Sequence, residues 1–230
     1  MAFCDYFVEG ECTINMLTQD KPDYIGKIRP DTYRAEMMGR NFGFVNDFLY
    51  QFTRSGMWTY DSMRKDHKGL YAVDHILGIM MLHDCNMWDS YAPVEYSARL
   101  YRALQRHGWG PSYKMIPYWD QKIVAMPERQ FATFYVDEFT DKAICIFYND
   151  TTAQGTQRLK LDWSKLGFKD ASRLKLENTG HELTTYTHGN PAIWHDYKCD
   201  YRPNPAYHAR IENGELAMPL MPYDYQMIVI

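Results

Sequence analysis

The change of pattern between Pro117 and Pro127 constrains the fold of this chain more than any other sequence feature. Beyond it, short β-prone runs alternate with turn residues. Asn213-Gly214 separates "YHARIE" from "ELAMPL", which is a strong signal for a β-hairpin. Short strands at this spacing predict an antiparallel β-sandwich over residues 128–230. The runs cover residues 131–136, 143–148, 157–161, 173–176, 182–187, 207–211, 216–219 and 225–230.

The first 122 residues carry longer segments that predict a mixed α/β half. Residues 1–8 are typical of a buried strand, and residues 42–52, "FGFVNDFLYQF", of a second strand. Residues 70–88 are apolar on nearly every side at 76–82, so this segment is buried, either as a helix throughout or as a helix that leads into a strand. A 3.6-residue apolar period after Pro93 predicts a helix that ends near residue 108.

Composition excludes several classes of protein. The 230 residues carry a net charge of −4, with 46% hydrophobic and 23% charged residues and no basic run, so nucleic acid is not an expected partner. No apolar run approaches the roughly 20 residues of a membrane helix. The N-terminus has no signal-peptide pattern, and the compartment stays open; secretion or a periplasmic location is possible if the native N-terminus is missing.

Cofactor and metal motifs are also missing from the sequence. The five cysteines are odd in number and lack CxxC spacing, so they indicate neither a disulfide framework nor a zinc site. No phosphate-binding glycine loop, GxSxG elbow or HExxH helix occurs. We therefore expect no metal and no cofactor.

Aromatic residues are abundant, at 16% of the chain, with 19 Tyr, 11 Phe and 6 Trp. Flat aromatic faces beside hydrogen-bonding groups suit sugar rings, which have apolar faces and polar rims. Core packing is the alternative explanation. Trp58 and Trp88 are the candidate sugar platforms under the first interpretation.

The stretch "CDYFVEGE" places Asp5, Glu9 and Glu11 within seven residues, directly behind an apolar start. Residues at the carboxyl end of a buried strand are where α/β enzymes place catalytic acids and bases. Gly10 could let the chain turn both glutamates toward one cleft. A charged loop that leaves the core is the alternative.

His83-Asp84 follows the apolar run of residues 76–82 and is the second candidate for substrate contact. If the run is a strand, its end delivers both polar groups to a cleft, where the histidine could donate to a sugar hydroxyl. The alternative is a capped, buried segment whose polar end is hydrogen-bonded in the core.

The second half resembles the C-terminal β-sandwich that follows the (β/α)8 barrel in many glycoside hydrolases, including α-galactosidase-like enzymes. The similar phrases are "AICIFYND", "LKLDWSKLGF", "LENTGHEL" and "GELAMPLMPYDYQMIVI", in this order. In the first half, "FCDYFVEGE" and "LGIMMLHDCNMW" resemble late-barrel segments of uncharacterised glycoside-hydrolase-like families. The resemblance implies a partial (β/α)8-barrel segment at residues 1–122 and an antiparallel β-sandwich at residues 128–230.

This resemblance implies a function in carbohydrate chemistry. A complete barrel takes about 250 residues, whereas 122 residues have room for about three βα units. We therefore expect a C-terminal fragment of a glycoside hydrolase-like protein, which hydrolyses O-glycosidic bonds if further N-terminal barrel sequence or a partner chain completes its active site. Catalysis would fall to Asp5, Glu9 and Glu11. The alternative is a non-catalytic carbohydrate-binding or structural module.

Overall fold

The computed structural model describes residues 6–9, 30, 31, 34, 45–49, 77–88, 94–179, 182–188, 197–203, 208–220 and 224–230. The chain divides into two compact units. The first, here called the α/β unit, comprises Met1–Ala98 and Tyr186–Cys199. The second, here called the β-rich unit, comprises Arg99–Thr185 and Asp200–Ile230.

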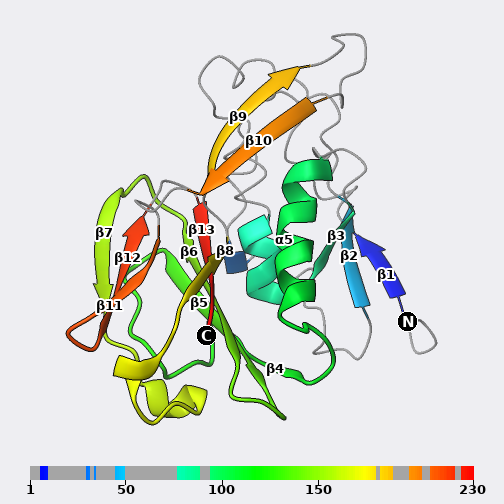
Figure 1. Ribbon diagram of the computed structural model, residues 1–230. Helices are drawn as coiled ribbons and strands as arrows, with labels where there is room; N and C mark the ends of the chain where they lie inside the picture. The colour runs from blue at the N-terminus through cyan, green and yellow to red at the C-terminus, as the bar shows by residue number, and fades with distance from the viewer. Residues whose placement is uncertain are drawn as a thin grey trace. The chain divides into compact units, whose positions relative to one another are not determined.

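A three-stranded parallel sheet lies in the α/β unit (Figure 1). Its strands are β1 (Tyr6–Glu9), β2 (Val45–Leu49) and β3 (Asn86–Trp88), in the spatial order β1-β2-β3. Both pairings are parallel. Parallel neighbours require a crossover connection, and the helical residues 77–83 lie in the crossover between β2 and β3. Of the two alternatives that the sequence left open for residues 70–88, the described residues 77–88 show the helix that leads into a strand.

Helix α5 (Val94–Arg106) follows β3, as its apolar period predicted. Leu100, Ala103 and Leu104 are buried on one side of the helix. Gly108 ends it in the left-handed region, with φ of 75°. The backbone N–H of Trp109 then donates to the carbonyl oxygen of Leu104 across 3.0 Å, which satisfies one of the last-turn carbonyls.

Two antiparallel sheets form the β-rich unit (Figure 1). The five-stranded sheet has the order β4-β5-β6-β13-β8, and the three-stranded sheet has the order β11-β12-β7. The antiparallel character predicted for the second half is confirmed. The strands are β4 (Tyr113–Ile116), β5 (Gln130–Asp137), β6 (Ala143–Asn149), β7 (Gly155–Leu159), β8 (Glu177–Thr179), β11 (Arg210–Glu212), β12 (Glu215–Leu220) and β13 (Asp224–Val229).

A further two-stranded sheet pairs β9 (Glu182–His188) with β10 (Tyr197–Pro203). Two short 3-10 helices, η3 (Trp163–Leu166) and η4 (Ala171–Arg173), follow β7. The strand predicted at residues 173–176 is wrong, because the Asp170 side chain accepts the N–H of Ser172 at 2.9 Å and starts η4 instead. Asn178 and Thr179, although Asn is common in turns, belong to β8.

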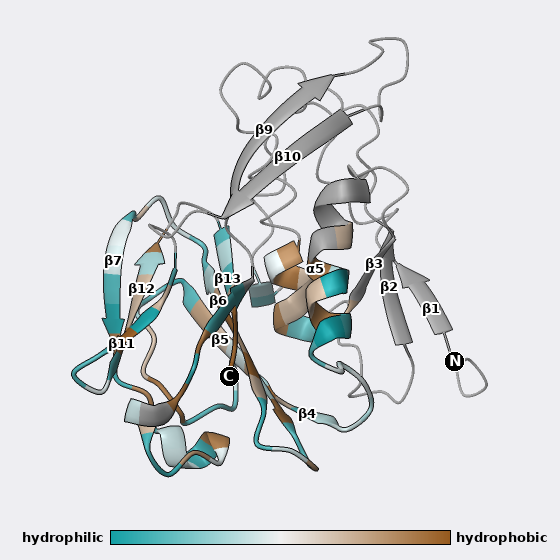
Figure 2. Cartoon of the chain, in the orientation of Figure 1, coloured by the Kyte–Doolittle hydropathy of each residue, from teal (hydrophilic) through white to brown (hydrophobic). Residues whose placement is uncertain are grey.

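One hydrophobic core joins the two sheets of the β-rich unit. Phe134 of β5 and Phe147 of β6 form an edge-to-face pair with ring centroids 5.9 Å apart. Leu159 of β7 and Met218 of β12 contribute to the same core from the other sheet. In Figure 2, brown, hydrophobic stretches are visible along the strands near the β5 label. The core explains why the short, individually weak strands fold together.

The five-stranded sheet is buried on both faces along β6 and β13, because every residue of these two strands is buried. An exposed outer face would alternate polar and apolar residues, so this pattern indicates a second covered face. Within the β-rich unit, Trp109 packs edge-on against Tyr135 at 4.6 Å, and Tyr118 against Phe131 at 5.0 Å. The predicted domain boundary between residues 122 and 128 stays a prediction; the sheet itself begins with β4 at Tyr113.

Candidate functional site at the carboxyl edge of the parallel sheet

The carboxyl ends of the three parallel strands meet at one edge of the sheet in the α/β unit. Strand β1 ends at Glu9, β2 at Leu49 and β3 at Trp88. Glu9 is in register with Phe48, and Leu49 is in register with Trp88. In α/β proteins this edge is where ligands bind, because the loops that leave it converge there. The structure therefore brings the strand ends of two predicted site residues, Glu9 and Trp88, to one edge.

Strand register also reveals two polar positions inside the sheet. Asp47 of β2 is the register partner of Val8 in β1 and of Asn86 in β3. Register partners share a face of a sheet, and so do residues two apart along a strand. Asp47, Asn86 and Trp88 therefore occupy one face, with Trp88 nearest the carboxyl edge.

Glu9 occupies the other set of register positions, with Phe48 and Met87. Because successive residues of a strand alternate between faces, Glu9 and Asp47 are placed on opposite faces of the sheet. Sequence analysis did not select Asp47 or Asn86. The available signal was a carboxylate in the middle of the apolar run "FVNDFLY", which is unusual for a strand of a parallel sheet.

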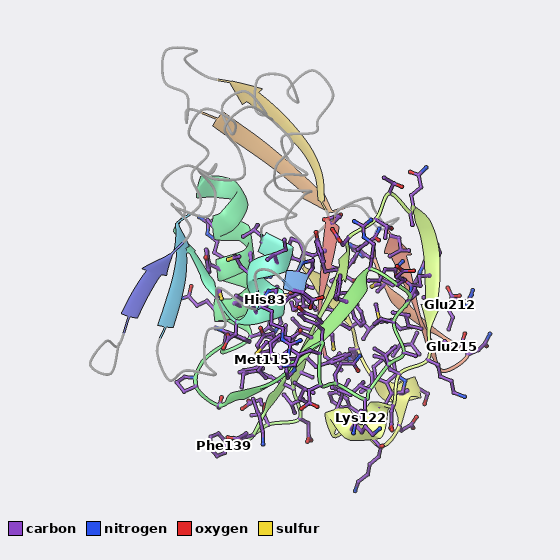
Figure 3. All side chains as sticks on the ribbon, turned by 180° about the vertical axis from the view of Figure 1, so that it is seen from behind. His83, Met115, Lys122, Phe139, Glu212 and Glu215 are labelled. Atoms are coloured by element: carbon purple, nitrogen blue, oxygen red, sulfur yellow. The ribbon has the colours of Figure 1, made fainter. Side chains whose placement is uncertain are left out.

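His83, labelled in Figure 3, lies in the last turn of the helical residues 77–83 and is 1% exposed. Its Nδ1 donates a hydrogen bond to the carbonyl oxygen of Ile79 across 2.7 Å. Burial is the main cause that lowers the pKa of His83 to about 4, and the positive charge of Arg34 acts in the same direction. Three effects weaker than burial raise this pKa: hydrogen bonds to the backbones of Ile79 and Pro30, and the negative charge of Asp31. The histidine is therefore neutral at pH 7.

Asp84 ends the same helix. Its backbone is left-handed, with φ of 56°, and the N–H of Cys85 donates to the carbonyl oxygen of Met80 across 3.0 Å. Aspartate tolerates this conformation better than most residues do, and the arrangement is a common helix stop. The strand-end argument for His83-Asp84 does not hold, because the apolar run before the pair is a helix and the pair precedes β3. This placement favours the alternative of a capped, buried segment. The assignment of His83 and Asp84 to substrate contact stays a prediction.

The remaining predicted site residues are less fully described. Asp5, Glu11 and Trp58 lie outside the residues that the structure describes. Glu9 and Trp88 are placed by their strands. The assignment of Asp5, Glu9 and Glu11 to catalysis, and of Trp58 and Trp88 to substrate binding, stays a prediction.

Buried carboxylates in the β-rich unit have structural partners. The Asp150 side chain is 2% exposed, and its Oδ2 accepts from Nη2 of Arg129 at 3.1 Å and from Nε at 3.2 Å. Asp224 Oδ1 accepts the N–H of Tyr225 at 2.7 Å. Among the described residues, no group of three metal-binding side chains converges, and no helix combines the length and apolar character needed to cross a membrane.

No protein-family model matches the chain, and no curated protein matches it significantly. The functional argument therefore rests on the sheet edge and on the sequence resemblance.

Proposed function

We propose that this chain acts on carbohydrate as part of a glycoside hydrolase-like protein, with its site at the carboxyl edge of the β1-β2-β3 sheet. The observation that carries the proposal is the register of that sheet, which gathers Glu9, Asp47, Asn86 and Trp88 within three adjacent strands. Carboxylates, amides and an aromatic ring are the groups that bind sugars, because they match vicinal hydroxyls and the apolar ring face.

The strand order supports a barrel segment. Three parallel strands lie in sequential order, and each is followed by helical residues: 30, 31 and 34, then 77–83, then α5. A (β/α)8 barrel is wound in this sequential way, whereas doubly wound sheets reverse direction at a switch point. The antiparallel sheets that follow agree with the appended sandwich of the families that the sequence resembles.

The placement of the carboxylates suggests separate roles. Glycoside hydrolysis needs two carboxyl groups, one on each side of the scissile bond. Glu9 and Asp47 occupy opposite faces of the sheet, so they do not form such a pair within it. We assign Glu9 to acid or base chemistry at the strand end. Asp47, with Asn86 beside it in register, is assigned to sugar hydroxyls.

A carbohydrate-binding module without catalysis is the second candidate. The last residues of the three strands favour this candidate. Strand β1 ends in Glu9, which is a carboxylate, whereas β2 ends in Leu49 and β3 in Trp88. An incomplete acid and base pair would leave binding intact and abolish hydrolysis.

Hydrolysis and binding assays on the full chain separate the two candidates. A panel of chromogenic α- and β-glycosides and calorimetric titration with the matching sugars should be run on the wild type, Glu9→Gln, Glu11→Gln and Asp47→Asn. Glu128→Gln, an exposed glutamate in the β-rich unit, is the matched control. For an enzyme, we expect a bell-shaped pH profile and a loss of about 10²- to 10⁴-fold in kcat/KM in Glu9→Gln or Glu11→Gln.

The other outcomes are equally definite. Sugar binding without turnover, weakened by Asp47→Asn and unchanged by Glu128→Gln, would support the module. If the wild type neither hydrolyses nor binds any sugar of the panel, a carbohydrate function of this chain is refuted.

A further inference from the structure

A rigid hairpin tip exposes a large aromatic ring in the β-rich unit. Residues 138–142 connect β5 to β6 and are all exposed, and Phe139 is 84% exposed. Asp137 organises the tip: its side chain accepts the backbone N–H of Phe139 and the hydroxyl of Thr140, and its own N–H donates to the Lys142 carbonyl oxygen across 3.0 Å. The hydroxyl bond is the main cause of a lowered Asp137 pKa. The ring is therefore presented to solvent on a fixed support.

A groove elsewhere in the same unit has a matching composition. Its volume is about 620 Å³, and its buried floor is formed by Ile123, Val124 and Leu161. Exposed, charged side chains line it as well: Lys122 and Lys160 are basic, and Asp162 is acidic. The groove thus combines an apolar floor with a basic rim.

Hydrogen bonds fix this groove as they fix the tip. The N–H of Asp162 donates to the carbonyl oxygen of Ile123 across 2.8 Å and joins the two chain segments that form the floor. Nζ of Lys165 donates to the carbonyl oxygen of Lys122 across 2.8 Å and lies 3.3 Å from Oδ2 of Asp162. A preformed groove of this kind loses little conformational entropy on binding.

The charges of the tip and the groove are complementary. Glu138 and Asp141 flank Phe139 at the tip, and Lys122 and Lys160 line the groove. Among the described residues, none of these four charged side chains takes part in an ion pair. The tip also carries Lys142, so its net charge is negative rather than purely acidic, and Asp162 at the groove is paired with Lys165, which leaves the charge of Lys122 and Lys160 in excess. Opposite net charges around apolar centres are the pattern of a hot spot and its receiving pocket.

We propose that the Phe139 hairpin of one copy docks in the lysine-rimmed groove of a second copy of this chain. Figure 3 shows Phe139 and Lys122 at the same end of the β-rich unit. Two copies that meet at this end can insert both hairpins across one two-fold axis, so each dimer contains the contact twice and leaves no open end. The proposal does not depend on a carbohydrate function.

Sedimentation velocity over a wide concentration range tests the self-association. The wild type should form a dimer in a concentration-dependent way, and raising salt from about 0.05 M to about 0.5 M should weaken it, because rim charges are screened. Phe139→Ser should raise the dimer dissociation constant at least about 10-fold, as loss of an aromatic anchor does. Because Phe139 is almost fully exposed, this variant should keep the wild-type thermal unfolding temperature.

Charge swapping identifies the two partners of the contact. Lys122→Glu with Lys160→Glu should weaken the dimer, as should Glu138→Lys with Asp141→Lys, and the quadruple variant should restore it. Lys175→Glu, at another exposed lysine, is the control for net charge and should have no effect. A monomer at every concentration overturns the proposal, as does a dimer that is insensitive to Phe139→Ser or a quadruple variant that stays monomeric.

Discussion

The buried His83 predicts a specific dependence of stability on pH. Burial lowers its pKa from 6.5 to about 4 in the folded chain. Between pH 4 and pH 6.5, His83 binds more protons in the unfolded chain than in the folded chain, so the free energy of unfolding rises with pH over this range. The stabilisation that comes from a neutral His83 is therefore complete above about pH 6.5 and is lost as the pH falls toward 4. At 1.36 kcal/mol for each pKa unit, the whole effect is about 3 kcal/mol, and about 2 kcal/mol of it is lost by about pH 5.

Urea unfolding at about pH 7 and about pH 5 measures this loss, in a range that lies above the titration of most carboxylates. His83→Asn keeps an N–H donor for the carbonyl oxygen of Ile79 and does not titrate. Between the two pH values, the free energy of unfolding of this variant should therefore fall by about 2 kcal/mol less than that of the wild type. An equal loss in His83→Asn and the wild type would refute the assignment of a neutral, buried His83.

Three further predictions concern the β-rich unit. Arg129→Ala should lower the free energy of unfolding by about 2 to 3 kcal/mol, because it removes the opposite charge and the two hydrogen bonds that Arg129 gives to the buried Asp150 carboxylate. Arg158→Ala, at an exposed ion pair, should cost less than about 1 kcal/mol in the same urea titration. Gly214→Ala should cost about 1 kcal/mol, because φ at this turn residue is 81°; a thermal unfolding temperature equal to that of the wild type would contradict this. Burial raises the pKa of Cys145, so iodoacetamide should label this thiol in urea but not in the native chain, as mass spectrometry can determine.

The antiparallel half was largely predictable from sequence because its signals are local. The turn residues Asn213 and Gly214 both have positive φ, which the paired hairpin turn requires, and the strands on either side pair as expected. The error at residues 173–176 has a local cause, whereas the strand at Asn178 depends on a distant partner. The Asp170 side chain caps η4 by accepting the N–H of Ser172, and this cap outweighs the strand propensity of the residues that follow. Asn178 is part of a strand because it pairs with Ile228 of β13.

The candidate site was less predictable, because it depends on pairing between distant segments. Sequence alone marks Glu9 as a strand-end acid, but only the register of β2 against both neighbours places Asp47 beside Asn86. For His83, an apolar run could be a strand or a helix, and periodicity does not separate the two when every side is apolar. The helix inverts the expected role of the histidine, from a group delivered to a cleft to one enclosed in a last turn.

The polar residues of the two units differ in whether a contact in the structure explains them. In the β-rich unit, the buried Asp150 is paired with Arg129, and Asn149 donates to the carbonyl oxygen of Ala153. These contacts explain why the residues are polar, and they need no ligand. In the α/β unit, Asp47 and Asn86 interrupt strands of a parallel sheet, a setting in which apolar residues are the rule. Sequences break local rules of this kind mainly where function requires it, so the parallel sheet is the part of the chain to test first for a bound sugar.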